Sequence, residues 1–365
     1  MNDQEPLQTP LVDWHRSHGA RMMDFAGWLM PIQYSTIVEE HHAVRKHVGL
    51  FDISHMGRLS ITGPAATEFL NGLVTLDVSR LTPGRIRYAL ATNEQGGIRD
   101  DILISRTDDG YQIVVNASNR EKIVNDWGDV AKAFEVTFTD HTFETAMIAL
   151  QGPEVETLIC QDFPEASELK YYRFSTVLSG NDELTLSRTG YTGEDGFEVI
   201  GPIPKIVSLW DKWIMSTNPA PLPCGLGCRD TLRLEAAMPL YGHELSEDID
   251  PLSAGLDFAV NLDKEFRGCA NLQRVKEQGP SQVRIGMSLE GKRIAREGAE
   301  IVSSSGEHLG NVTSGTFSPT LQQSIAMGYV LPSASEAGTN LAVVINGKNY
   351  PAVVSSLPFF KRPKN

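Results

Sequence analysis

Two adjacent carboxylates, Asp100 and Asp101, lie inside an apolar segment, residues 98–106, that alternates as a strand does. Ionised side chains are costly there unless they are solvated, hydrogen-bonded or paired with a charge. Consecutive strand residues point to opposite faces, so the two cannot address one site as a catalytic dyad. Spacing leaves the choice between them open, and the alternative interpretation places one or both at a strand end near solvent.

A glycine-rich segment, RTGYTGEDGFEV (residues 188–199), combines glycines, hydroxyl groups and three carboxylates between two expected strands. Such a loop can bring backbone atoms and short acceptors close to a planar ligand. The segment lacks the Gly-x-Gly-x-x-Gly fingerprint, and the chain has no Walker A motif, which disfavours nucleotide-phosphate cradles. The alternative is a glycine-rich hairpin with a solvated acidic tip.

Arg229 begins an expected helix, RDTLRLEAAMPLYGHEL. It is either an anion-binding residue or part of a helix salt-bridge network with Arg233 and Glu235. Just before it, Cys224 and Cys228 have a spacing that resembles half a zinc site, but no second pair of cysteines or histidines accompanies them. We therefore predict no metal site and reduced thiols.

The charge balance excludes some partners. The chain of 365 residues has a formal net charge of −14, so attachment to nucleic-acid phosphates is not expected. No apolar run approaches the roughly 20 residues that span a bilayer, and the N-terminal string MNDQEPLQTP does not resemble a signal peptide. These features predict a cytoplasmic protein that does not bind membranes.

The elements that must position these residues alternate between helix and strand. A capping box at Thr36 and Glu39 begins a helix that reaches Val48, and Gly49 ends it. A strand around residues 59–61 and a helix over 65–74 follow, and then a hairpin whose arms are 86–90 and 98–106. A strand over 111–115 and a helix from about Ser118 complete a mixed unit over residues 51–140.

The second half repeats this mixture and then changes character. Strands are expected over 184–188 and 197–200, an amphipathic helix carries Ile206, Trp210 and Trp213, and a further helix holds Leu232. After Gln273 the chain turns to short apolar runs broken by Gly, Ser and Pro, which is typical of a small β-barrel or jelly roll. We expect an α+β region over 1–275, made of two interleaved domains, and a C-terminal β domain over 276–365.

A set of strings in a fixed order resembles the aminomethyltransferase T-protein family from about residue 10 to the C-terminus. They are DFAGWLMPIQY, FDISHMG, NEQGGIRDD, VVNASNR, RTGYTGEDGFEV, GCRDTLRLEAAMPLYG and TSGTFSPTL. The resemblance implies a three-domain clover-leaf of α+β and β parts that encloses a folate site. It also implies that the carboxylate after Gly-Gly-Ile is catalytic, and the matching residue is Asp101. The implied folate contacts are Tyr88, Val115, Asn116, Tyr191, Glu198 and Arg229.

The reaction implied by the resemblance begins with an S-aminomethyl dihydrolipoyl arm on the H-protein. Ammonia leaves, and tetrahydrofolate, a co-substrate, captures the carbon as 5,10-methylenetetrahydrofolate. Asp101 would stabilise developing positive charge and move protons. The alternatives are a folate-dependent demethylase of the same fold and a non-catalytic folate-binding scaffold for iron–sulfur maturation. The scaffold's Lys-Gly-Cys-Tyr-x-Gly-Gln-Glu motif is absent from this chain, and so is an N-terminal dinucleotide motif.

Overall fold

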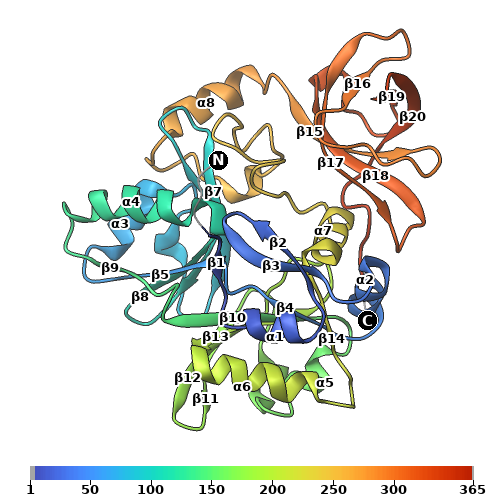
Figure 1. Ribbon diagram of the computed structural model, residues 1–365. Coiled ribbons are helices and arrows are strands. Elements are labelled where there is room, and N and C mark those ends of the chain that lie inside the picture. Colours follow the sequence, from blue (N-terminus) through green and yellow to red (C-terminus); the bar gives the residue numbers. More distant parts are fainter. Residues whose placement is uncertain (1–4, 364–365) are drawn as a thin grey trace. The chain divides into compact units, whose positions relative to one another are not determined.

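The computed structural model describes residues 5–363, which form two compact units (Figure 1). Unit 1 comprises the chain up to Phe69, Val78–Tyr88 and Ile102–Asp230. Unit 2 comprises Leu70–Asp77, Ala89–Asp101 and the chain from Thr231 onward. The first four residues of MNDQEPLQTP lie outside the described part. Between residues 5 and 363, no helix is both long enough and apolar enough to cross a membrane.

Helices are spread along the chain up to the start of the C-terminal strands. They are α1 (Val12–Ser17), α2 (Ile37–Lys46), α3 (Ala66–Leu73), α4 (Arg120–Ala131), α5 (Val155–Ile159), α6 (Ile203–Ile214), α7 (Leu226–Glu235) and α8 (Cys269–Gln278). The capping box predicted for α2 is present, because Thr36 Oγ1 accepts a hydrogen bond of 3.1 Å from the backbone N–H of Glu39. The helices predicted around 65–74, after Ser118 and around Trp210 are confirmed as α3, α4 and α6.

The largest sheet of unit 1 has six strands. Its order is β11 (Phe174–Ser179), β12 (Asp182–Ser187), β13 (Gly196–Pro202), β10 (Thr145–Gln151), β4 (Gly49–Asp52) and β14 (Leu222–Pro223). One face packs leucine, isoleucine and valine side chains against α5 and against the tryptophans of α6, and forms a core. The sheet is therefore sealed on that face, and polar chemistry is confined to the other.

A second sheet contains the predicted hairpin. Its order is β6 (Ile86–Thr92), β7 (Ile98–Arg106), β8 (Gly110–Val115), β5 (Gly57–Thr62) and β9 (Thr137–Asp140). A small third sheet contains β1 (Leu7–Gln8), β3 (Trp28–Gln33) and β2 (Arg21–Phe25). The turn between β6 and β7 requires glycine at residue 97, because a Cβ there would lie 1.7 Å from the carbonyl oxygen of Glu247.

The C-terminal part of unit 2 is a closed six-stranded barrel. Its order is β15 (Val283–Leu289), β18 (Gln323–Val330), β17 (His308–Ser318), β16 (Glu300–Val302), β19 (Asn340–Ile345) and β20 (Lys348–Ser355). Closure removes free strand edges, and the interior is filled by apolar side chains. The α+β class and the C-terminal β-barrel predicted from the sequence are confirmed. The domain boundary near residue 275 stays a proposal.

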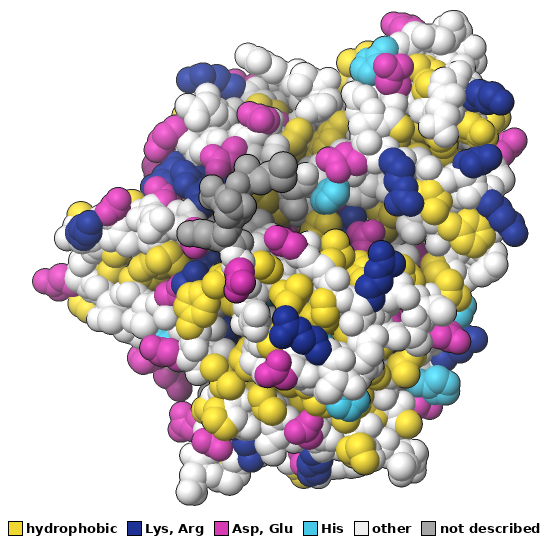
Figure 2. All heavy atoms as spheres, viewed as in Figure 1, with side chains coloured by type: hydrophobic (Ala, Val, Ile, Leu, Met, Phe, Trp, Pro, Cys, Tyr) yellow, Lys and Arg dark blue, Asp and Glu magenta, His cyan; other side chains and the backbone are white. Residues whose placement is uncertain are grey.

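The surface agrees with the mixed composition of the chain. On the face shown in Figure 2, acidic and basic side chains are interspersed with apolar ones. Acidic residues outnumber basic ones, 46 to 32, over the whole sequence. This is the pattern of a solvated globular surface.

Candidate functional site

Glu198 lies on the face of the six-stranded sheet that does not bear the apolar core. It pairs across the ladder with Ala149, and Ala149 pairs with Phe51, so all three project from this face. The leucines of the adjacent rows point the other way, into the core. The alternation of side chains along β13 therefore places the Glu198 carboxylate, which is only 7% exposed, on this face beside the small side chain of Ala149.

The glycine-rich loop before β13 is held against this face by Gln151. Its Nε2 donates to the carbonyl of Thr189 (3.1 Å), and its Oε1 accepts from Thr192 Oγ1 (2.8 Å). A Cβ at Gly190 or Gly196 would lie about 2 Å from the Gln151 amide, at 2.0 and 2.1 Å. The glycines allow this close approach, and the amide then fixes the loop.

The acidic tip of the loop is not solvated. Glu194 and Arg45 form an ion pair of 3.0 Å with side chains only 7% and 5% exposed. Asp195 forms a second pair, of 2.5 Å, with Arg188, which also binds Glu156. The alternative of a hairpin with a solvated acidic tip is therefore wrong, because basic side chains of the same unit cover the carboxylates.

Tyr191, Glu198 and Arg229 come together within unit 1. The Arg229 guanidinium lies over the Tyr191 ring, 4.8 Å from its centroid. Burial raises the pKa of Glu198, and a hydrogen bond from Thr189 and the charge of Arg229 oppose the rise. Burial likewise lowers the pKa of Arg229, and Glu198 opposes it.

No direct ion pair between described residues joins Glu198 to Arg229. Arg229 Nη1 is buried and has no hydrogen-bond partner within residues 5–363. Buried polar atoms are normally hydrogen-bonded, so Arg229 Nη1 still requires a hydrogen-bond acceptor. The arrangement can bind a flat ligand whose edge carries both donors and acceptors.

His55 is a polar residue of this region that no sequence pattern marks for a role. It lies in the turn between β4 and β5, is 2% exposed, and its Nδ1 has no hydrogen-bond partner among the described residues. Burial and the charge of Arg229 lower the pKa of His55 to about 3, so the ring is neutral. The string FDISHMG contains it, but neither periodicity nor spacing distinguishes it from a core histidine.

A buried chain of hydrogen bonds supports the same turn. Asp52 Oδ2 accepts from His15 Nε2 at 2.9 Å, and a hydrogen bond of 2.8 Å joins His15 Nδ1 to the Tyr34 hydroxyl. Burial raises the pKa of Asp52, but the hydrogen bond and charge of His15 outweigh it and hold that pKa at about 2. The ionised carboxylate also accepts from the backbone N–H of Ser54 at 2.9 Å.

The other predicted folate contacts of unit 1 lie on the five-stranded sheet or directly after one of its strands. Tyr88 is in β6, and Val115 is the last residue of β8, paired with Gly57 of β5. A Cβ at Gly57 would meet Val115 at 2.4 Å, so the valine is tightly packed. Asn116 follows as the N-cap of a short 3-10 helix. Tyr88 and Val115 belong to this sheet and Asn116 directly follows it, whereas Glu198 belongs to the six-stranded sheet, Tyr191 to the loop before β13 and Arg229 to α7.

Asp101 belongs to unit 2, together with Asp100. Asp100 is fully buried, whereas Asp101 is partly exposed. Tyr241 lies nearby: its hydroxyl donates to the carbonyl of Ile98 at 3.1 Å, and its pKa is raised by burial and by Glu247 and both aspartates. The two carboxylates therefore differ in access, as opposite faces of one strand require.

Arg233 and Glu235, the other charged residues considered on α7, bind partners outside this helix. Arg233 Nη1 donates to Glu244 Oε2 at 2.7 Å, and Nη2 donates to Ser314 at 2.8 Å. Glu235 accepts from the hydroxyl of Ser318. Both side chains are buried and reach the barrel strand β17, so their interactions extend beyond the helix.

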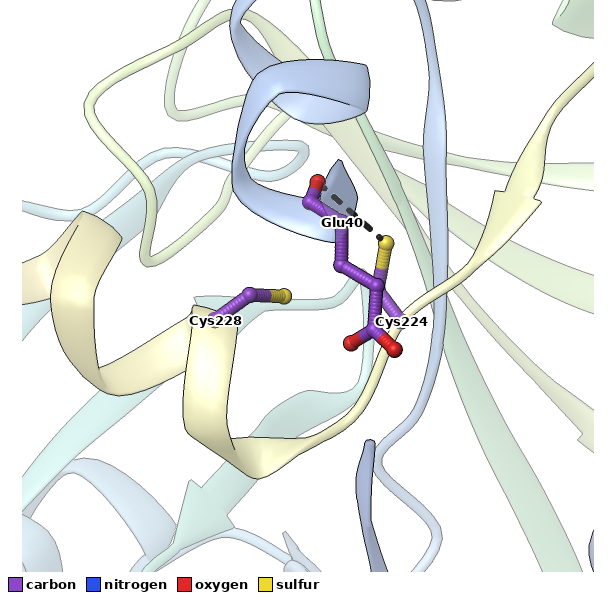
Figure 3. Close-up of side chains that lie close together, drawn as sticks. All are labelled: Glu40, Cys224 and Cys228. Carbon is purple, nitrogen blue, oxygen red and sulfur yellow. Dashed lines mark hydrogen bonds between the residues drawn. The ribbon is translucent and has the colours of Figure 1, made fainter. Parts of the chain in front are cut away.

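Cys224 and Cys228 have a third neighbour, Glu40 of α2 (Figure 3). The ligand atoms lie within 4.8 Å of one another, and all three residues are buried. Spacing could not reveal Glu40, because 184 residues separate it from Cys224. The group is the only candidate for metal ligation found among residues 5–363, and the cysteine spacing alone did not reveal its third member.

Hydrogen bonds give this cluster a structural role. The Glu40 carboxylate accepts from the backbone N–H groups of Tyr34, Ser35 and Gly225, at 2.6, 3.1 and 2.9 Å. It thereby satisfies an unpaired N–H at the start of α7. Burial, Cys224 and Glu40 raise the pKa of Cys228, which keeps it a neutral thiol. The cluster ties α2 to α7, the helix that carries Arg229.

Comparison with known proteins accounts for nearly the whole chain. Residues 11–264 match the family described as the GCVT N-terminal domain, and residues 282–361 match the glycine cleavage T-protein C-terminal barrel domain. The aminomethyltransferase of Rubrobacter xylanophilus is 46% identical over 98% of this chain and 95% of its own length. That of Symbiobacterium thermophilum is 43% identical over 98% of both chains.

A solved structure shows the same fold. The glycine cleavage system aminomethyltransferase T from Bartonella henselae superimposes with a TM-score of 0.92 at 34% identity, covering 97% of this chain and 98% of that one. Fold and sequence together define a one-carbon group transferase. The chain belongs to the aminomethyltransferase T-protein family of the glycine cleavage system.

Proposed function

We propose that this chain transfers the methylene carbon of an aminomethyl group on the lipoyl arm of the H-protein to tetrahydrofolate, with release of ammonia. The observation that carries the folate part is the buried pair Glu198 and Arg229. The two residues interact electrostatically but form no direct ion pair between described residues. A ligand that supplies both a donor and an acceptor to them relieves the cost of their burial.

A pterin ring has the required chemistry. Its amide and amino groups offer N–H donors to the Glu198 carboxylate, and its carbonyl oxygen and the folate carboxylates are acceptors for Arg229. The Tyr191 ring, already in contact with the Arg229 guanidinium, offers a flat face for packing. Charge, hydrogen bonding and shape thus support the same class of ligand.

The remaining folate contacts are proposed from the family resemblance, and their positions support them. Tyr88 offers a second aromatic ring, and Asn116 offers an amide beside the buried Val115. None of these three side chains carries a formal charge, so they suit the less polar part of a folate. We propose that they line the ligand rather than anchor it.

We propose Asp101 as the catalytic carboxylate. The difference in burial between Asp100 and Asp101 supports this assignment, because a group that exchanges protons with a substrate must be accessible to it. An ionised Asp101 would stabilise positive charge that develops on a folate nitrogen and would accept or return a proton there. The partner that delivers the one-carbon unit is proposed to be the lipoylated H-protein.

Reconstitution of glycine cleavage tests the proposal. The other three components of the system are combined with and without this protein and with and without tetrahydrofolate. We expect ammonia release and formation of methylenetetrahydrofolate that require both additions. Folate binding without turnover would contradict the proposed transfer and would support a demethylase or a scaffold instead.

A further inference from the structure

The turn that carries His55 is fixed on every side by hydrogen bonds within unit 1. Ser54 Oγ donates to the carbonyl of Met147 at 3.1 Å. Arg58 Nη1 donates to the carbonyls of Ser54 and Met56, at 2.9 and 2.5 Å. A side chain on such a turn has little freedom, which is the condition for a pre-organised binding group.

The His55 ring is also held in place. It forms a T-shaped contact with the Phe25 ring, with centroids 5.8 Å apart and an interplanar angle of 82°. The side chain is almost completely buried, yet its Nδ1 has no hydrogen-bond partner within residues 5–363. A rigid turn that buries a polar atom without a partner is unfavourable unless something else supplies the bond.

Arg229 presents the same anomaly close by. Its Nη1 is buried and has no hydrogen-bond partner in the described part of the chain, and its charge acts on both His55 and Glu198. The sheet explains why the two residues lie close together, because β4 and β14 run parallel as neighbours. His55 follows β4, and Arg229 follows β14 in the chain. Both therefore lie beyond the carboxyl ends of two adjacent parallel strands.

We propose that His55 is a further ligand-binding residue, whose Nδ1 forms a hydrogen bond with the polar edge of the folate ring system beside Arg229. This inference rests on the proposed function. The neutral imidazole has one N–H and one lone pair, so it can complete the donor and acceptor pattern without adding charge. Beside a cation this is the favourable choice, because a protonated histidine would repel Arg229.

Nuclear magnetic resonance of protein labelled with ¹⁵N-histidine tests the hydrogen bond directly. The probe is 5-methyltetrahydrofolate, a reduced folate that cannot accept the methylene group. The His55 resonances are identified by their absence from the spectrum of His55→Phe. We expect the Nδ1 resonance of His55 to shift when the probe is added, and that of His47, an exposed residue paired with Glu154, to stay unchanged.

Affinity measurements on matched variants provide the second arm. His55→Phe keeps a flat ring against Phe25 but removes both nitrogens, and we expect it to weaken binding of the probe about tenfold. His55→Asn returns a polar atom near the Nδ1 position and should recover part of the loss. His47→Gln serves as the control and should bind as the wild type does. Melting temperatures of all variants are measured without the probe to verify folding.

The outcomes separate this inference from the proposed function. If the wild type does not bind the probe, the proposed function fails. If the wild type binds it, an unshifted Nδ1 resonance, or a His55→Phe affinity within twofold of wild type, overturns the role of His55 alone. Either of these two results is expected if the hydrogen-bond partner of Nδ1 is a buried water molecule and not the probe. If His55→Phe does not fold, the His55 resonances are identified from the spectrum of His55→Asn. The shift of the Nδ1 resonance in the wild type then decides whether His55 binds the probe.

Discussion

Glu198 and Arg229 are the proposed ligand anchors of unit 1, because no direct ion pair among residues 5–363 compensates the burial of either charge. Each pKa is displaced toward the neutral form by burial, and each residue opposes the displacement of the other. A structural ion pair would show direct contact and satisfied hydrogen bonds. The separation of these two groups instead favours a ligand that bridges them.

The raised pKa of Glu198 predicts how folate binding depends on pH. The carboxylate must be ionised to accept N–H donors, so affinity should fall as pH drops through a value above the ordinary 4.5. Equilibrium titrations with 5-methyltetrahydrofolate between pH 4 and 8 measure this. In Glu198→Gln the affinity should be lower and this inflection should be absent. An unchanged inflection in the variant would assign it to another group.

Asp101→Asn is expected to lower turnover by roughly a hundredfold or more, the usual scale for a general acid or base. Folate binding should be largely retained, because no folate anchor is removed. Steady-state rates with reconstituted components and a separate binding measurement test the two statements. Asp100→Asn is the matched control on the opposite face of the strand. An equal loss of turnover from Asp100→Asn would sink the assignment to Asp101.

At the scale of elements, the loop before β13 depends on the absence of side chains at its glycines. Gln151 occupies the space beside Gly190 and Gly196 and hydrogen-bonds to Thr189 and Thr192. Thr189 in turn donates to Glu198 at 2.6 Å. The glycines thus leave room for the Gln151 amide, the amide fixes the loop, and the loop holds Thr189 where it donates to the Glu198 carboxylate.

Gly196→Ala is therefore expected to displace Gln151 and destabilise the protein by about 1–3 kcal/mol, the range for overpacking of a core. Folate affinity should fall with it. Gly128→Ala is the control, because Gly128 lies within α4 with no atom near its missing Cβ, and alanine favours a helix. Denaturant unfolding curves of the two variants measure the difference. Equal stability of Gly196→Ala and Gly128→Ala would contradict the packing argument.

Unit 2 is held together by a buried network between α7 and the barrel. Arg233 binds Glu244 and Ser314, and Glu244 also accepts from Thr313 at 2.6 Å and from the backbone N–H of Leu240 at 3.0 Å. The Arg233 and Glu244 side chains are 2% and 0% exposed. A buried pair is costly to break from one side, because it leaves an uncompensated charge.

Glu244→Gln should therefore destabilise unit 2 by about 3–5 kcal/mol, the range found when one partner of a buried pair is removed. The double variant Arg233→Met with Glu244→Gln should recover part of this loss, because no isolated charge remains. Calorimetric unfolding of the three proteins provides the comparison. A double variant less stable than Glu244→Gln would show that the network acts in another way.

At the scale of the whole molecule, acid stability should depend on two buried groups. The pKa of His55 is lowered from 6.5 to about 3, and that of Asp52 from 3.8 to about 2. In both cases the folded state binds protons less readily than the unfolded state, so stability is lost as pH falls. His55 contributes to this loss of stability between pH 6.5 and 3, and Asp52 contributes between pH 3.8 and 2.

We expect His55→Phe to reduce the pH dependence of the unfolding free energy between pH 6.5 and 4 by up to about 1.4 kcal/mol per pH unit, which corresponds to one proton. Denaturant midpoints at several pH values, compared with His47→Gln, measure the slope. Parallel curves for wild type and His55→Phe would mean that His55 titrates normally in the folded protein.

Much of the fold follows from local signals. Capping at Thr36, period-2 alternation around the turn that contains Gly97, and the apolar stripe of α6 each depend on residues close together in the chain. The order of family strings further implied Asp101 and the six folate contacts. Local rules could not choose between Asp100 and Asp101, because both alternate correctly.

The sequence by itself determined the α+β class, the C-terminal β domain, the family and the residue types available for chemistry. Only the tertiary structure brought Glu40 to Cys224 and Cys228, placed His55 close to Arg229, and covered Glu194 with Arg45. Periodicity reports which face a residue occupies, not which distant segment packs on that face. Those contacts are set by the closure of long loops and the order of strands in a sheet, which no short window of sequence contains.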